Sequence, residues 1–438
     1  MRTVLHFKKK SQNEWVILFI LMLTLLYGII DLVNVSALKY TMDIAWVFLL
    51  VTLALNQFRI PNKELKASFR CIWIFLVLTW VGFIISGGPI KYYLWGFRNN
   101  FRFFVFFLAC VKFLDAEDID GYLRLMNKLF YLHFAVAMIQ YYVLGLEQDL
   151  LGGIFGTQEG NNGPSLMFML IVLTHSMLSY VAKREKLVAF AVKGIMAIII
   201  AAFSELKVFF VLYIFIMALS FLLTNFTFKK LLAVVLAIGG IVVGVGLLEK
   251  VFPNWAGWFT WESLMEIGSS TEGYTGKGDL NRLTAIPTVW NGFLNTWPKR
   301  LLGYGLGNCD NASFSFLTSP FYERYNHLHY HWFSSAFTLL ETGLLGFGVY
   351  ILFFVTTFWG ALKRKKNKAA GNIHCQLAMV MSVISVVLII YNHSMRTEAG
   401  YMMYFILALP FVGNKRKKLT NSRESQTEIR SNGWQTNR

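Results

Sequence analysis

The sequence predicts an all-α polytopic membrane protein with about twelve transmembrane helices and one large extracytoplasmic loop between helices 9 and 10. Hydrophobic residues make up 56% of the 438 residues and charged residues only 15%, whereas soluble proteins carry about 25% charged residues. Apolar runs long enough to cross a bilayer as helices recur along most of the chain. The placement of the basic residues then orients these runs.

The candidate spans follow one another along the chain as solid hydrophobic segments. They are Trp15–Ile30, Met42–Leu55, Cys71–Ser86, Phe103–Leu114, Leu129–Leu146, Pro164–Val181, Leu187–Ser204, Val208–Thr224, Leu231–Leu248, Ser334–Phe358, Leu377–Tyr391 and Gly400–Val412. The second and fourth are short and need flanking aromatic residues at the membrane interface. The first is followed by Asp31 and by no small-residue cleavage site, so we read it as a span and not as a removable signal.

The net charge of +17 comes mainly from basic clusters that flank the hydrophobic segments. Between Lys250 and Asn326 the sequence holds six basic and six acidic side chains, so the large loop is electrically balanced. The excess therefore reflects the positive-inside bias of cytoplasmic loops and does not indicate nucleic-acid binding. Because basic segments fall at every second connection, we expect both termini to be cytoplasmic.

This topology divides the chain into four parts. Residues 1–249 hold helices 1–9, residues 250–330 form the large extracytoplasmic loop, residues 331–413 hold helices 10–12, and residues 414–438 form a polar cytoplasmic tail that we expect to be disordered. Only Cys309 lies in the large loop. No external disulfide is therefore predicted, and no residues have metal-ligand spacing.

Two arginines, Arg98 and Arg102, precede the fourth predicted span at its outer end. Their four-residue spacing puts both guanidinium groups on one face of a helix. Paired arginines at the start of a helix can bind a phosphate or diphosphate through forked hydrogen bonds and the helix dipole. The alternative is that both side chains snorkel to lipid headgroups.

Ionisable residues also occur in and between the predicted spans, where they are functional candidates. Glu205 and Lys207 occupy a short turn between the seventh and eighth spans, and a local ion pair that caps this hairpin is the alternative. Glu341 begins the stretch Glu341–Gly346 inside the tenth span. Its two glycines indicate close helix packing beside a buried polar contact.

The large loop carries Arg282 and a Gly-x-Gly-x-Gly motif formed by Gly303, Gly305 and Gly307. No strand–helix–strand unit surrounds the motif, so it is not a dinucleotide-binding fingerprint. Because glycine adopts backbone conformations that other residues avoid, we expect the motif to turn tightly beneath a ligand. Arg282 is either a ligand-binding cation or a member of a surface salt bridge.

Three alternating histidines, His327, His329 and His331, precede the tenth span. A histidine at this position can act as a general base at the outer leaflet, or it can simply be interfacial. A metal site would need more carboxylate or cysteine neighbours than Glu323 alone.

On these features the chain resembles the O-antigen ligase/polymerase superfamily of bacterial surface-polysaccharide enzymes. Members share the topology predicted above, and their outer loop carries an Arg and a Trp, a Pro-hydrophobic-Gly-x-Gly-x-Gly stretch, a His, and then an acid-x-Gly-hydrophobic-hydrophobic-Gly element. The matching residues here are Arg282, Trp290, Pro298, Leu302–Gly307, His329 or a neighbour, and Glu341–Gly346.

The chain departs from the family pattern at two positions. The family often has Ser-Arg in the turn after the seventh span, where this chain has Ser204, Glu205, Leu206 and Lys207, so Lys207 would have to supply the positive charge. The family histidine is commonly followed by Asn, which none of the three histidines here precedes. The catalytic histidine is therefore ambiguous.

The resemblance implies glycosyl transfer from an undecaprenyl-diphosphate-linked sugar at the outer leaflet of the bacterial inner membrane, with no cofactor and no metal. The implied site has three groups of residues: Arg98, Arg102, Lys207 and Arg282 on the leaving diphosphate, His329 or else His331 as the general base, and Glu205, Gly303, Gly305, Gly307 and Glu341 in support. Expected partners are lipid-linked glycans, membrane lipids, and chain-length regulator and flippase proteins.

Three functions remain compatible with these motifs. We favour a polymerase, which moves the growing glycan onto the next lipid-linked repeat unit. A ligase, which moves the finished glycan onto a terminal acceptor, has the same motifs. A lipid-linked oligosaccharide flippase is the rival from another class, but a transporter would place its ionisable residues near the middle of the membrane.

Overall fold

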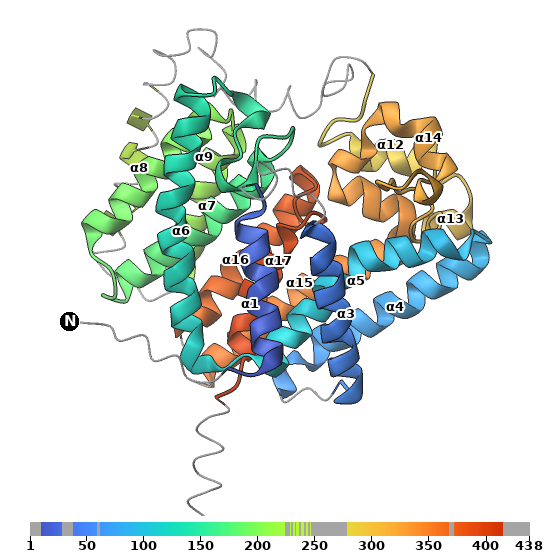
Figure 1. Cartoon of the computed structure of the whole chain (residues 1–438), viewed down its shortest axis with the longest axis horizontal. Coiled ribbons are helices and arrows are strands. Elements are labelled where there is room, and N and C mark those ends of the chain that lie inside the picture. The colour runs from blue at the N-terminus through green and yellow to red at the C-terminus, as the bar shows by residue number, and fades with distance from the viewer. Residues whose placement is uncertain are drawn as a thin grey trace, which may run out of the picture.

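The computed structural model describes residues 10–28, 38–58, 62–223, 278–367 and 372–414, together with isolated residues between 228 and 246. The described residues fold into helices and connecting turns without any strand, as Figure 1 shows. The predicted all-α class is therefore confirmed for this part of the chain. The first part of the large loop (250–277), the tail from residue 415 and eight of the eighteen residues of the ninth predicted span lie outside the described residues.

The described residues of the ninth predicted span are helical, and the other eleven spans coincide with helices of defined bounds. They are α1 (Gln12–Leu25), α3 (Lys39–Leu55), α4 (Lys66–Ser86), α5 (Ile90–Phe113), α6 (Ala116–Tyr142), α7 (Asn162–Val181), α8 (Leu187–Phe203), α9 (Lys207–Leu222), α15 (Ser334–Lys366), α16 (Asn372–Tyr391) and α17 (Gly400–Ala408). Short 3₁₀ turns lie at Lys63–Leu65, Gln148–Leu150, Gly153–Phe155, Ser315–Leu317, Asn326–Leu328, Tyr330–Trp332 and Leu409–Phe411.

Four of the described helices are long and apolar enough to cross a membrane: Lys63–Ser86, Asn162–Val181, Ser334–Lys366 and Asn372–Tyr391. Several others are equally apolar but shorter, among them α8 and α9. The chain is thus a helical membrane protein by length and hydropathy, whereas the number of twelve spans stays a prediction.

The helices run alternately up and down, so their connections gather at two ends of the bundle. At one end the turn before α7 meets the turn after α16, because an added Cβ at Gly163 would lie 3.1 Å from the Asn392 side chain. The same turn reaches the start of α15, where the Ser334 amide donates to the Asn392 carbonyl (3.1 Å). We call this the outer end, since the predicted topology places these connections outside.

The other connections meet at the opposite, inner end. Asn62, before α4, donates to the Phe411 carbonyl after α17. The Ala116 amide at the start of α6 donates to the Gly413 carbonyl (3.2 Å). Arg184, after α7, pairs with Asp120 of α6 at 3.3 Å. This arrangement follows the alternation that the basic segments predict.

α5 begins much earlier than its predicted span, at Ile90 instead of Phe103. Its first half is polar by sequence but helical, because its arginines find acidic partners on neighbouring elements. Arg98 forms a forked ion pair with Asp43 of α3 (both N–O distances 2.8 Å), and Arg102 pairs with Glu398 (3.0 Å). The expectation that both arginines sit at a helix N-terminus is therefore wrong, since they lie in the middle of α5.

The described part of the large loop, residues 278–333, forms a small helical unit on the outer end, which we call the outer segment. It contains α12 (Ala285–Gly292), α13 (Trp297–Leu302) and α14 (Pro320–Tyr325) and lies beside α4 and α5 in Figure 1. It has its own apolar core, in which Val289, Leu294 and Tyr330 are buried against Phe337 of α15. The outer segment is therefore packed onto the membrane helices.

Candidate functional site

Two cavities lie next to each other at the outer end, where helices α5, α7, α15 and α16 begin or end. The first, of about 310 Å³, is lined among others by Asp149, Asn162, Glu205, Arg282, Trp332 and Tyr391; we call it the Arg282 cavity. The second, of about 360 Å³, is lined among others by Trp95, Arg102, Asp310, Phe337, Arg396 and Glu398; we call it the Arg396 cavity. His331 and His393 line both.

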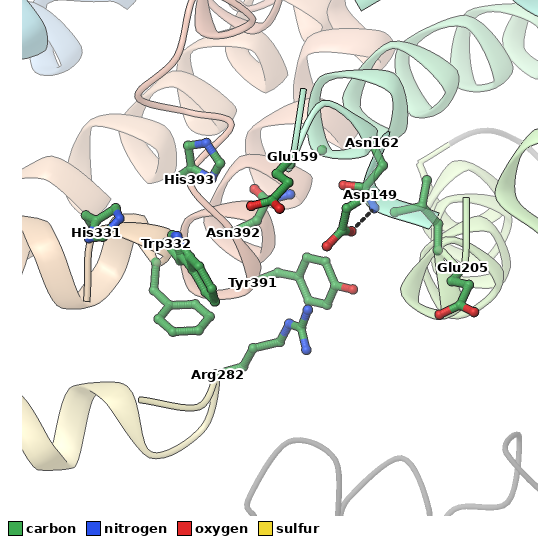
Figure 2. A pocket seen from close by; sticks show the side chains of 14 residues that line it. Asp149, Glu159, Asn162, Glu205, Arg282, His331, Trp332, Tyr391, Asn392 and His393 are labelled. Atoms are coloured by element: carbon green, nitrogen blue, oxygen red, sulfur yellow. Dashed lines mark hydrogen bonds between the residues drawn. The ribbon is translucent and has the colours of Figure 1, made fainter. Parts of the chain in front are cut away.

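The Arg282 cavity brings together charges of both signs (Figure 2). The Arg282 guanidinium lies 4.4 Å from the ring centre of Tyr391, at the end of α16. Asp149, Glu159 and Glu205 line the wall that comes from the α6–α7 and α8–α9 connections. Arg282 is thus a cavity residue.

The turn between α8 and α9 contributes Glu205 to this wall. Glu205 has a φ of +50°, which is uncommon for a residue other than glycine. Its carboxylate accepts a hydrogen bond from Gln148 (3.0 Å). Burial raises the pKa of Glu205, while this hydrogen bond and the charge of Lys207 act in the opposite direction. Lys207 is within electrostatic reach of both Glu205 and Arg282, as the predicted grouping requires.

The Arg396 cavity contains Arg102, which is only 3% exposed and therefore does not snorkel to lipid headgroups. Its guanidinium donates to Glu398 and to the Arg396 carbonyl, both at 3.0 Å. Burial raises the pKa of Glu398, but the charges of Arg102 and Arg98 and the hydrogen bonds to the carboxylate together outweigh burial and keep that pKa below its usual range. Arg102 therefore holds the 392–399 connection against α5.

Arg396 is the second guanidinium of this cavity. It lies over the Phe337 ring at 3.6 Å, and its acidic neighbours Asp310 and Glu341 are 3.6 and 3.8 Å away. Its Nη1 atom is buried and has no hydrogen-bond partner among the described residues. With one face covered by a ring and unused donor capacity, Arg396 is suited to bind an anion in the cavity.

Arg98 lines neither cavity. Both of its outer nitrogens are engaged, because one donates to Asp43 and the other to Asn99 (2.7 Å). The four cations of the predicted diphosphate site are consequently not brought together. Arg102 lies in one cavity, Arg282 and its neighbour Lys207 at the other, and Arg98 joins α5 to α3.

The glycine motif turns tightly, with a positive φ at Gly303, Gly305 and Gly307, and docks the outer segment onto α15; it lines neither of the two cavities. α15 is interrupted at Gly343, whose φ/ψ of 61°/−170° is not helical. The amides of Tyr304 and Gly305 donate to the Leu340 and Glu341 carbonyls (2.9 and 3.0 Å). These bonds compensate for helix hydrogen bonds that the interruption disturbs.

Glu341 completes this junction from within α15. Its Oε1 accepts hydrogen bonds from the amides of Gly307 (2.8 Å) and Cys309 (3.4 Å), while its Oε2 faces Arg396. The predicted buried polar contact at Glu341 is therefore present. It links the glycine motif to the Arg396 cavity.

The three histidines occupy different surroundings. His327 is exposed. His329 has a φ of +51°, stacks on Trp332 at 3.9 Å and lines neither cavity. His331 lines both cavities. Burial, together with the charges of His393 and His329, lowers the pKa of His331 to about 4. The geometry therefore favours His331 over His329 as a base.

Sequence reasoning missed the connection between α16 and α17, which supplies Asn392, His393, Arg396 and Glu398 to the two cavities. The polarity of this connection was the available signal. Its eight residues include an Arg, a His and a Glu and lie on the predicted outer face, where the positive-inside rule does not favour arginine. Asp310, in the outer segment, was also missed.

No protein-family model matches the chain, and no curated protein matches it. The assignment of a function therefore depends on the two cavities, the charges that line them and the histidine that they share.

Proposed function

We propose that this protein is a membrane glycosyltransferase that polymerises undecaprenyl-diphosphate-linked repeat units of a bacterial surface polysaccharide. It acts at the outer leaflet of the inner membrane, with both termini in the cytoplasm. The observation that carries the proposal is the pair of polar cavities with His331 in their common wall. A transfer reaction needs one site for each substrate and a base where they meet.

The charges decide which substrate each cavity takes. The Arg396 cavity offers two guanidinium groups, Arg102 and Arg396, and suits the donor diphosphate. The Arg282 cavity has one guanidinium among several carboxylates, and suits the acceptor sugar. Arg282 lies on the side of the acceptor, and Lys207 lies close enough for the two like charges to repel each other, which adds to burial in lowering the pKa of Lys207.

The reaction is a single displacement at the anomeric carbon of the donor. His331 takes the proton of the acceptor hydroxyl, and the hydroxyl oxygen forms the new glycosidic bond. The bond from the anomeric carbon to the diphosphate oxygen breaks, and its electron pair leaves with the diphosphate. Arg102 and Arg396 stabilise that growing negative charge. The product has inverted configuration at the anomeric carbon.

The base is tested with purified protein, a lipid-diphosphate donor and an acceptor, comparing His331→Ala with His329→Ala. We expect His331→Ala to lose about a hundredfold or more in transfer rate, the usual size of a general-base contribution, and His329→Ala to keep most of it. The reverse result would make His329 the base. Normal turnover in both variants would exclude His331 and His329 as the base and leave His393, which also lines both cavities.

The choice between polymerase and ligase is tested in a deletion strain by analysis of its lipid-linked glycans. A missing polymerase leaves single repeat units on the lipid. A missing ligase leaves full-length polymer on the lipid, and that outcome would replace our proposal with the ligase. If the glycans are unchanged, the protein acts on another substrate.

A further inference from the structure

The acidic wall of the Arg282 cavity has no part in the chemistry of the transfer step. Asp149, Glu159 and Glu205 face a space of about 310 Å³ to which the described residues contribute one guanidinium, that of Arg282. Figure 2 shows Arg282 approaching from the outer segment and the carboxylates lying across the cavity from it. Such a balance of charge disfavours an anionic ligand and favours a neutral or cationic one.

We infer that the Arg282 cavity selects a sugar that carries no negative charge, either neutral or bearing a free amine, and that Glu205 is a specificity-determining residue. This inference rests on the proposed function for the identity of the ligand as a glycan. It goes further by excluding uronic acids and other acidic sugars from the acceptor position.

The rest of the lining matches sugar chemistry. Asn162 and Asn392 provide amide donors and acceptors, and Tyr391 and Trp332 provide aromatic rings. Carboxylates and amides form hydrogen bonds with sugar hydroxyls, and aromatic rings pack on their apolar faces. The cavity therefore holds the groups that a polyhydroxylated ligand needs, without the cluster of cations that an acidic ligand needs.

Asp149 also accepts a hydrogen bond, from Asn162, but Glu205 differs from the other two carboxylates in its burial and its backbone conformation. Asp149 and Glu159 are exposed, whereas Glu205 is partly buried. Its backbone has a φ of +50°, and its carboxylate is fixed by the hydrogen bond from Gln148. Uncommon backbone conformations of this kind occur often at ligand sites, where the side chain must point in one direction.

The inference is tested by equilibrium binding of three trisaccharides to the purified full chain: glucosamine (cationic), N-acetylglucosamine (neutral) and galacturonate (anionic). We expect the anionic trisaccharide to bind at least about tenfold more weakly than the neutral one, because like charges close together are strongly unfavourable. The protein as a whole carries a net charge of +17, so non-specific attraction would give the opposite order.

Glu205→Gln should reduce this discrimination several-fold, since glutamine keeps the size of the side chain and its ability to accept from Gln148. The matched control is Glu147→Gln, which removes the same charge from an exposed residue nearby that does not line the cavity. We expect this control to discriminate like the unmodified protein.

Three results would overturn the inference: equal or tighter binding of the galacturonate trisaccharide, no binding of any of the three, or the same discrimination in Glu205→Gln as in the unmodified protein. The transfer assay is a separate measurement. If the protein discriminates between the trisaccharides but transfers no sugar, the proposed function is wrong and the glycan site remains. If it transfers sugar but does not discriminate, only the selectivity is wrong.

Discussion

His331 combines a half-buried position with a place in both cavities. Burial, His393 and His329 lower its pKa to about 4, against about 6.5 for a free histidine. The imidazole is therefore neutral at physiological pH, which is the form that accepts a proton. The His331 side chain binds a proton more readily in the unfolded chain than in the folded protein. Its contribution to folding stability is therefore lost as the pH falls from about 6.5 towards 4.

The transfer rate should therefore keep its neutral-pH value well below pH 6.5 and fall only as the pH approaches 4. His393→Asn should move this acid limb to higher pH, because it removes a neighbouring positive charge that lowers the pKa of His331. The measurement is kcat/KM against pH for both proteins. An acid limb that stays in place would show that His331 does not titrate in the reaction.

Arg396 is the residue that we expect to matter most for the donor diphosphate. Arg396→Gln should lower the transfer rate by about 10²–10³-fold, as loss of one charge-stabilising donor usually does. Arg396→Lys should recover only part of it, because a point charge lacks the fork of a guanidinium.

The control for Arg396 is Arg324→Gln. Arg324 is exposed on α14, with its guanidinium 5.4 Å from the centre of the Tyr325 ring. This variant should transfer normally. Equal activity of Arg396→Gln and Arg324→Gln would remove Arg396 from the site. Thermal unfolding of each variant in detergent shows whether a loss of activity comes from misfolding.

Of the individual residues that line the two cavities, the sequence predicts some and misses others. Arg102, Arg282 and His331 stand out because polar residues are rare at the ends of hydrophobic segments. Arg396 belongs to a short connection that carries few residues and no motif. Its role depends on Asp310 and Glu341, which are far away in the sequence, and such a contact has no local pattern.

Among the elements, the glycine motif decides how the outer segment meets the helices. Gly307 has a φ of +82°, and an added Cβ would lie 1.8 Å from the Tyr92 carbonyl oxygen of α5. At Gly303, with a φ of +74°, it would lie 2.4 Å from the Glu341 carbonyl carbon of α15. Both positions therefore exclude any side chain.

Gly307→Ala should lower the thermal midpoint of the purified protein by several degrees and reduce transfer, because strain and overlap together exceed about 1 kcal/mol. Gly292→Ala is the matched control. It lies in α12, where an added Cβ meets nothing within 4 Å, so the midpoint should stay the same or rise slightly. Similar midpoints for Gly307→Ala and the unmodified protein would contradict the docking role.

The predicted helices agree with the structure best where hydropathy is continuous, as in α7 and α16. Agreement fails where a helix carries charges that other elements neutralise. α5 extends back to Ile90 because Asp43 and Glu398 pair with its arginines, and α6 extends back to Ala116, where Asp115 caps the first turn. Partners of this kind become known only once the chain has folded.

Across the whole molecule, the alternating connections make the topology testable by cysteine labelling. The native Cys71, Cys110, Cys309 and Cys375 are all buried and should give little background. Phe316→Cys, at a position 62% exposed in the outer segment, should react with a membrane-impermeant reagent in intact cells. Arg184→Cys, at the inner end, should react only after the membrane is permeabilised. Labelling of Arg184→Cys in intact cells would reverse the orientation.

The position of His331 and His393, which line both cavities, also constrains the order of events in the reaction. Because the proposed base, His331, borders both cavities, the acceptor must be present when the donor bond breaks, and both substrates must be bound together in a ternary complex. Initial rates measured against both substrates should therefore give intersecting double-reciprocal lines, whereas parallel lines would indicate a ping-pong mechanism with a glycosylated enzyme. Donor alone should then be hydrolysed only slowly, so the protein would retain each lipid-linked chain until the next hydroxyl arrives.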